Sequence, residues 1–150
     1  MTPLNTSDKV ELIELKPDNE PVLIDFILSH ISAGFPSPSD DYIEAKLDLN
    51  EYLMQNSSST FILRVSGDSM IGAGIHSNDL LIVDRSLEAT NKKIVIAVLN
   101  GDLTVKRIRI NRRTKQVRLI AENAQYPDIL ITEEMNFRIW GVVTSVIHKF

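Results

Sequence analysis

The sequence predicts a mostly-β domain that follows a flexible N-terminal arm and a short helix. Most of the second half consists of short runs of β-branched and apolar residues separated by turn-forming residues, a pattern typical of strands. The first 38 residues contain five prolines and no sustained helical or strand period, which favours an arm. We therefore expect the arm to cover residues 1–38 and the β domain to cover residues 39–150.

The arm carries two short apolar runs, over residues 10–15 and 22–31, and it ends in Ala33-Gly34-Phe35-Pro36-Ser37-Pro38. Glycine and proline at this point favour an extended or turn conformation, so we place the boundary there. Beyond it, Asp48 and Glu51 stand at the N-cap and N3 positions of a capping box. This pattern predicts a short helix over about residues 48–55, which the serines at 57–59 would end.

The predicted strands occupy residues 61–65, 80–83, 94–99 and 137–147, where Val, Ile and other strand-forming residues are concentrated. Residues 104–110 and 116–120 form a further predicted pair. The polar segment 111–114 between them is short enough to close a hairpin. Together these runs predict one β-rich domain.

Composition excludes several classes of function. There is no cysteine, and the three histidines, His30, His76 and His148, are far apart in the sequence, so we expect neither a metal site nor a cofactor. The longest apolar stretch is too short to span a bilayer, and no signal-peptide pattern precedes it, so we expect a cytoplasmic protein. Residues 1–33 carry six acidic and two basic residues, which argues against a DNA-binding headpiece.

The most informative segment is Ser66-Gly67-Asp68-Ser69-Met70. A second motif, Thr104-Val105-Lys106-Arg107, follows it and places Lys106 37 residues after Ser69. A serine hydroxyl is a weak nucleophile and needs a base, which a neutral lysine can provide. An ordinary lysine, with a pKa of about 10.4, would need a depression of roughly three units by burial. Strand alternation places Lys106 on the same face as Ile108 and Ile110, with Arg107 and Arg109 on the opposite, solvated face.

Each motif alone also has a structural explanation, since Ser-Gly-Asp-Ser is a common turn composition and a lysine in a hairpin is usually solvated. Together, in this order and 37 residues apart, Ser69 and Lys106 resemble the nucleophile and base of the LexA/UmuD-type self-cleaving peptidases, family S24. The resemblance implies a signal-peptidase-like β domain and cleavage between Ala33 and Gly34. It also implies an oxyanion site formed by the backbone N–H groups of Asp68 and Ser69.

One position departs from the family pattern. Asn78 replaces the usual glycine before Asp79. Because asparagine tolerates a left-handed backbone better than other non-glycine residues, we expect the turn to persist.

The resemblance is closest to the UmuD branch. It implies a homodimer whose arm is removed when a RecA–single-stranded-DNA filament promotes self-cleavage in the SOS response. The trimmed dimer would then act as a subunit of a UmuC-type Y-family polymerase in translesion synthesis. The sequence does not indicate whether a subunit cuts its own arm or its partner's.

Two alternatives remain open: a polymerase-docking module without enzymatic activity, and a fragment of a LexA-like repressor. The short acidic segment before Ala33 leaves little room for the helix-turn-helix domain of a repressor. Residues 106–118 contain seven basic residues and no acidic one. Since no aromatic residue is interleaved with them, a solvated hairpin or a patch for a protein partner is favoured over direct DNA binding.

Overall fold

The computed structural model describes residues 9–13, 22–27, 32–35 and 44–150. The chain forms two compact units, one made of Met1–Leu15 with Asn56–Phe150 and the other of Lys16–Gln55. The expected boundary after residue 38 lies outside the described residues. Within the residues that are described, no helix has the length and apolarity that a membrane span requires.

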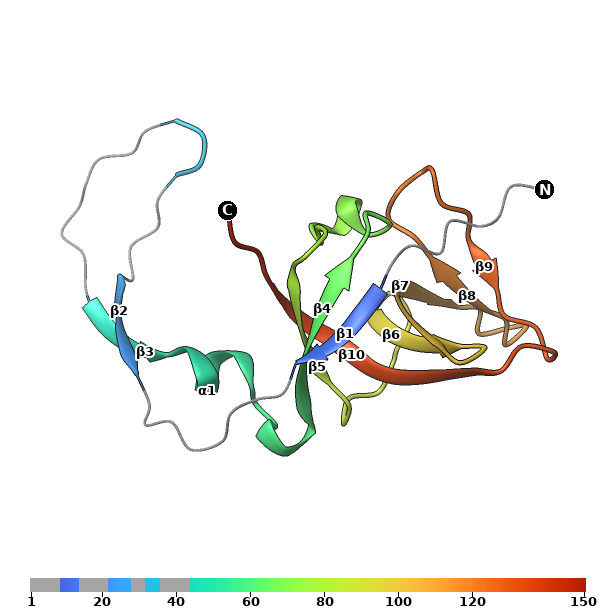
Figure 1. Cartoon of the computed structure of the whole chain (residues 1–150), viewed down its shortest axis with the longest axis horizontal. Coiled ribbons are helices and arrows are strands. Elements are labelled where there is room, and N and C mark those ends of the chain that lie inside the picture. Colours follow the sequence, from blue (N-terminus) through green and yellow to red (C-terminus); the bar gives the residue numbers. More distant parts are fainter. Residues whose placement is uncertain (1–8, 14–21, 28–31, 36–43) are drawn as a thin grey trace. The chain divides into compact units, whose positions relative to one another are not determined.

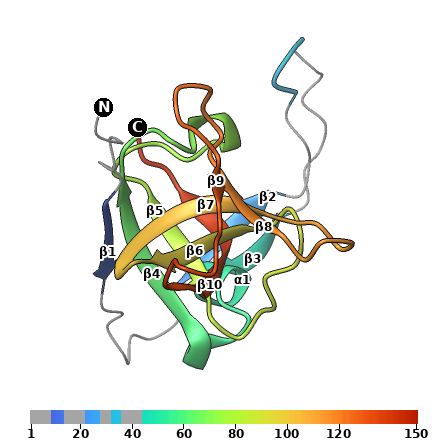
Figure 2. The same cartoon turned by 90° about the vertical axis from the view of Figure 1, so that its right-hand side faces the viewer.

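The first unit is built on an antiparallel sheet (Figures 1 and 2). Its strand order is β1-β4-β5-β10-β6-β7-β8-β9, and every neighbouring pair is antiparallel. The strands are β1 (Lys9–Ile13), β4 (Thr60–Ser66), β5 (Leu80–Asp84), β6 (Ile94–Leu99), β7 (Asp102–Ile110), β8 (Val117–Ile120), β9 (Ile129–Leu130) and β10 (Phe137–Ile147). The mostly-β class and the predicted strands are thereby confirmed.

The central strand β10 changes partner along its length, which curls the sheet. Its first half pairs with β6 and its second half with β5, with register shifts between Ile139 and Gly141 and between Val143 and Ser145. Such irregularities bend a strand and increase its twist. A Cβ at Gly141 would lie 2.6 Å from Cγ1 of Val83, so glycine permits the close approach to β5.

Apolar side chains pack on the curled sheet in two clusters. One cluster contains Leu63, Val65, Met70, Ile75, Leu81, Val83, Ile96 and Val105. The other contains Val95, Ala97, Ile108, Leu119 and Val142. Because Val105 and Ile108 belong to different clusters, β7 contributes to both, and its central residues are shielded from water.

The arm contains more regular structure than its sequence predicts. β1 forms the edge of the sheet and pairs with β4 through five residue pairs, from Lys9 with Ser66 to Ile13 with Ile62. This strand was not predicted because its partner lies about fifty residues away, and pairing at that distance leaves no local periodicity.

The described residues of the second unit form a two-stranded sheet and one helix. β2 (Leu23–Ile27) pairs antiparallel with β3 (Glu44–Asp48), and α1 (Leu49–Leu53) follows directly. The predicted short helix is confirmed: Asp48 is its N-cap, and a carboxylate oxygen of Asp48 accepts a hydrogen bond from the backbone N–H of Asn50. The side chains of Val22, Leu23 and Phe26 are exposed.

Asp84, at the end of β5, is a buried carboxylate that organises the start of β4. It accepts hydrogen bonds from the Asn56 side chain, from the Ser59 hydroxyl, and from both the backbone N–H and the hydroxyl of Ser86. The hydrogen bond from Asn56, followed by those from Ser86, holds the pKa of Asp84 well below its ordinary value and outweighs the opposing effect of burial. The charged form therefore stabilises the folded state.

We therefore expect the free energy of unfolding to decrease in acid, and part of this decrease to come from protonation of Asp84. A carboxylate whose pKa is lower in the folded state contributes stability above its unfolded pKa of about 3.9 and loses it as the pH falls further. We expect Asp84→Asn to lower the free energy of unfolding by about 1–3 kcal/mol at neutral pH, because its amide cannot accept all of these hydrogen bonds. The difference from the unaltered protein should shrink between pH 5 and about pH 2. Urea unfolding across this range measures it, and a constant difference would contradict the assignment.

Candidate active site

Ser69 and Lys106 lie side by side in the first unit. Ser69 is in the turn between β4 and the short 3₁₀ helix Ile71–Ala73 (η2), and Lys106 is in the middle of β7. Lys106 Nζ donates a hydrogen bond of 3.1 Å to Ser69 Oγ. Ser69 is 1% exposed and Lys106 6% exposed. The two residues that the motifs single out therefore meet in a site from which water is largely excluded.

The Lys106 amine also contacts two neutral oxygens. Nζ donates to Thr104 Oγ1 and to the carbonyl of Val105, at 3.0 Å each. A lysine is seldom buried unless it is paired, because removal from water disfavours its charged form. These contacts hold the amine beside the serine oxygen.

The expected separation of β7 into an apolar and a solvated face is only partly correct. Arg109 is exposed as expected, but Arg107 is half-buried and Val105 is fully buried. Arg107 forms an ion pair with Glu122 and donates to the carbonyl of Lys92. The guanidinium is thus held against the protein by two specific acceptors, which strand alternation cannot predict.

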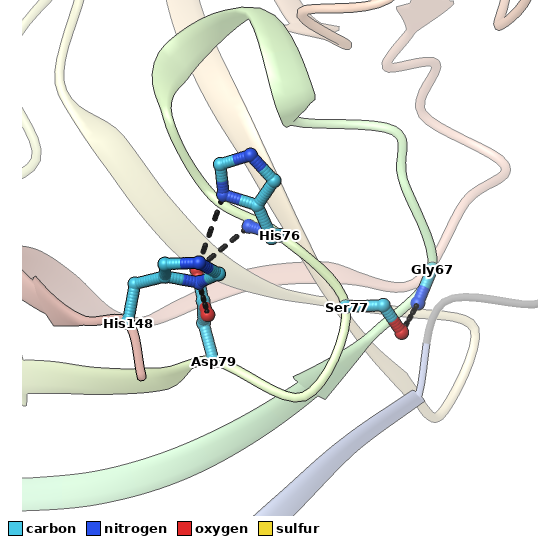
Figure 3. Close-up of polar contacts among 5 residues, drawn as sticks. All are labelled: Gly67, His76, Ser77, Asp79 and His148. Carbon is cyan, nitrogen blue, oxygen red and sulfur yellow. Dashed lines mark hydrogen bonds and ion pairs between the residues drawn. The ribbon is translucent and has the colours of Figure 1, made fainter. Parts of the chain in front are cut away.

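The base of the loop that carries Ser69 is closed by backbone hydrogen bonds. The N–H of Asn78 donates to the carbonyl of Val65, and the N–H of Val65 donates to the carbonyl of Asp79. Asn78 has φ 73°, so it adopts the left-handed conformation expected at this position. The N–H of Gly67, itself at φ 102°, donates to Ser77 Oγ across the loop (Figure 3).

A second segment, residues 122–126, forms hydrogen bonds with the same loop. The carbonyl of Glu122 accepts from the N–H of Gly72, the Asn123 amide donates to the carbonyl of Asp68, and the Tyr126 hydroxyl donates to Asp68 Oδ1. A Cβ at Gly72 would lie 2.6 Å from the Glu122 carbonyl oxygen, so only glycine allows this approach. The contacts hold the residue next to Ser69 in place.

The sequence gives no signal for this second segment. Asn123 and Tyr126 are more than fifty residues from Asp68, and neither belongs to a motif. The assignment of the Asp68 and Ser69 N–H groups to an oxyanion site stays a prediction.

Ala33 and Gly34 belong to the other unit, in an exposed bend over residues 32–35. The N–H of Gly34 is 3.3 Å from Ser32 Oγ, and among the described residues beyond its two chain neighbours, a Cβ at Gly34 would meet only this oxygen within 4 Å. Phe35 is 90% exposed. Both residues of the predicted cleavage site are therefore exposed among the described residues.

A third group of polar side chains, His76, Asp79 and His148, was not predicted (Figure 3). Asp79 is 3% exposed and lies between the two imidazoles. Burial tends to raise the pKa of Asp79, but the backbone hydrogen bond from His76 and the contact with His148 outweigh it and lower that pKa. His76 and His148, although far apart in the sequence, therefore meet at Asp79 in the structure.

The fold and the buried pair define the class of protein: an antiparallel β domain that places a serine beside a lysine in its interior. The family described as Peptidase S24-like matches residues 25–144. Protein SamA of Salmonella typhimurium is 41% identical over 92% of this chain and 96% of its own length. Protein MucA of Escherichia coli is 41% identical over 91% and 92% of the two chains, and protein ImpA of Shigella flexneri 43% over 78% of each.

The chain belongs to the S24-like peptidase family and, within it, to the group of UmuD-like proteins.

Proposed function

We propose that this protein is an SOS mutagenesis factor that cleaves its own Ala33-Gly34 bond, with Ser69 as the nucleophile and Lys106 as the base. The observation that carries the proposal is the 3.1 Å contact between Lys106 Nζ and Ser69 Oγ in a buried site. Membership of a family of self-cleaving peptidases supports it. A structural lysine has no comparable reason to be buried against a hydroxyl, because burial of a charged amine is costly.

The reaction proceeds in two halves. Neutral Lys106 takes the proton of Ser69 Oγ as that oxygen attacks the carbonyl carbon of Ala33, and backbone N–H groups stabilise the oxyanion. When the tetrahedral intermediate collapses, the C–N bond breaks and the Gly34 amine leaves with the proton from Lys106. An ester now joins Ala33 to Ser69. Water, deprotonated by Lys106, attacks the ester carbonyl. The bond to Ser69 Oγ then breaks, Lys106 returns the proton to Ser69 Oγ, and residues 1–33 leave with a new carboxyl group.

Cleavage requires the exposed bend at Ala33 to enter the site in an extended form. A RecA–single-stranded-DNA filament that binds this docked form better than the open form would raise its population and so the rate. This effect needs no residue of the filament in the site, because Ser69 and Lys106 are already in contact. The reaction would take place in the cytoplasm, within a homodimer.

Loss of the arm would also change the edge of the main sheet. The removed fragment contains β1, the edge strand of the sheet, which pairs with β4 through five residue pairs. Without β1, the N–H and C=O groups along that edge of β4 are open to pairing with another strand. We propose that the trimmed homodimer uses surfaces uncovered in this way to join a UmuC-type Y-family polymerase. Equal affinity of the intact and trimmed forms for that polymerase would contradict this step.

The proposal predicts that the purified protein divides into two fragments, residues 1–33 and 34–150. Incubation at mildly alkaline pH should produce them slowly, and addition of RecA with single-stranded DNA should accelerate the reaction. Intact-mass spectrometry identifies the cut to the residue. A chain that stays whole under both conditions would favour the rival function, a polymerase-docking module that never cuts itself.

A further inference from the structure

Three side chains that commonly bind transition metals converge at the base of the nucleophile loop. Asp79 and His76 come from the turn before β5, and His148 follows the end of β10 (Figure 3). The Nδ1 atom of His76 lies 3.7 Å from Asp79 Oδ2, and Nδ1 of His148 lies 2.5 Å from Asp79 Oδ1. One potential ligand atom from each residue falls within 4.8 Å of the other two.

The carboxylate at the centre of this group is rigidly placed. Asp79 Oδ2 accepts a 2.7 Å hydrogen bond from the backbone N–H of His76, and the Asp79 backbone is bonded to Val65 of β4. The two imidazoles pack at 4.6 Å between ring centroids, and their side chains are 47% and 35% exposed. One side of the group is therefore held by the protein, and the other is open to water.

We propose that His76, Asp79 and His148 form a binding site for a divalent transition-metal ion, with Zn²⁺ as the best fit. Two imidazole nitrogens and one carboxylate oxygen are a common three-residue ligand set for zinc, and water completes the tetrahedron at an open fourth position. The site is separate from Ser69 and Lys106, and its existence does not depend on self-cleavage.

The distances between the donor atoms are compatible with such an ion. Bonds of about 2.0–2.1 Å arranged tetrahedrally place ligand atoms roughly 3.3 Å apart. The separation of 3.7 Å between His76 Nδ1 and Asp79 Oδ2 is already close to this value, whereas His148 Nδ1 lies 2.5 Å from the other carboxylate oxygen, Oδ1, and must shift for one oxygen to bind the same ion as both imidazoles. Turning the half-exposed His148 side chain provides this shift without moving the buried carboxylate.

Metal binding at this position would join the turn before β5 to the segment after β10. The turn that carries His76 and Asp79 closes the loop on which Ser69 lies, through the hydrogen bonds of Asn78 and Asp79 with Val65. His148 directly follows β10 in the sequence. A bound ion would therefore tie this loop to the end of β10 and make it harder to open.

Calorimetric titration of the full chain with zinc chloride tests the site, with protein purified without a polyhistidine tag. We expect one ion per chain, and a weakening of about tenfold or more in His76→Ala and in His148→Ala. His30→Ala, which removes the remaining histidine, is the matched control and should bind as the unaltered protein does. Zinc should also raise the Tm of the unaltered protein and the control, but not that of the His76 and His148 variants.

Two results would contradict the proposed zinc site. One is zinc affinity retained in a His76→Ala/His148→Ala double variant, and the other is no saturable binding of zinc by the unaltered protein. If His148→Ala unfolds, His148→Phe keeps a ring against His76 and Phe150, where the present ring contacts are 4.6 Å and 5.3 Å, but provides no ligand. Loss of zinc binding in folded His148→Phe supports the site, and unchanged binding refutes it.

Discussion

Ser69→Ala is expected to leave the chain whole under every condition in which the unaltered protein divides at Ala33-Gly34. The hydroxyl oxygen is the atom that forms the ester, so its loss should reduce the rate by at least about 10⁴-fold. Lys106→Ala should have a comparable effect, because it removes the group that accepts the proton. Intact-mass spectrometry after incubation with RecA and single-stranded DNA measures both variants.

Two exposed residues of the same types, Ser58 and Lys93, provide matched controls. Ser58→Ala and Lys93→Ala should be cut at the unaltered rate. All four variants should also unfold at a similar Tm to be compared fairly, and the small side chain of alanine fits the space that Ser69 occupies. Cleavage of Ser69→Ala or Lys106→Ala at the same bond and the same rate would show that the assigned pair is wrong.

The rate of self-cleavage is expected to depend strongly on pH. If Lys106 acts as a neutral base, the cleavage rate without RecA should rise about tenfold per pH unit until the amine is largely unprotonated, and then level off. Lys106→Arg tests the cause, since a guanidinium stays charged throughout this range and cannot accept the proton. We expect that variant to be uncut at every pH at which the protein is folded. A rate that does not change with pH would exclude a lysine base.

The fold could be predicted from the sequence where its signals are local. The strands around Ile94–Leu99 and Phe137–Ile147 are rich in β-branched residues, and the helix after Asp48 begins with its own cap. β1 could not be predicted in the same way. It is a strand because β4 offers it an open edge, and that edge is visible only after the fold has formed.

The candidate active site likewise contains residues with a local sequence signal and residues without one. Ser69 and Lys106 stand out because each belongs to a short motif, and their separation in sequence is informative. Asn123 and Tyr126, which hold Asp68, have no motif and reach it only through the folding of a distant segment.

The group around Asp79 was missed for a similar reason, since His148 is 69 residues away from it. Long-range polar contacts of this kind depend on the register of the sheet, and local composition does not encode them. Only the left-handed turn at Asn78, which brings Asp79 into position, could be anticipated from the sequence.

The protonation of a single amine is the point on which the catalytic proposal rests. Nuclear magnetic resonance of selectively labelled lysine side chains in Ser69→Ala, which should remain uncut, can follow Lys106 as the pH is raised, with Lys106→Ala identifying its signal. The proposal predicts that this lysine loses its proton well before the other lysines do. Titration of Lys106 together with the exposed lysines, near the ordinary pKa of about 10.4, would contradict it.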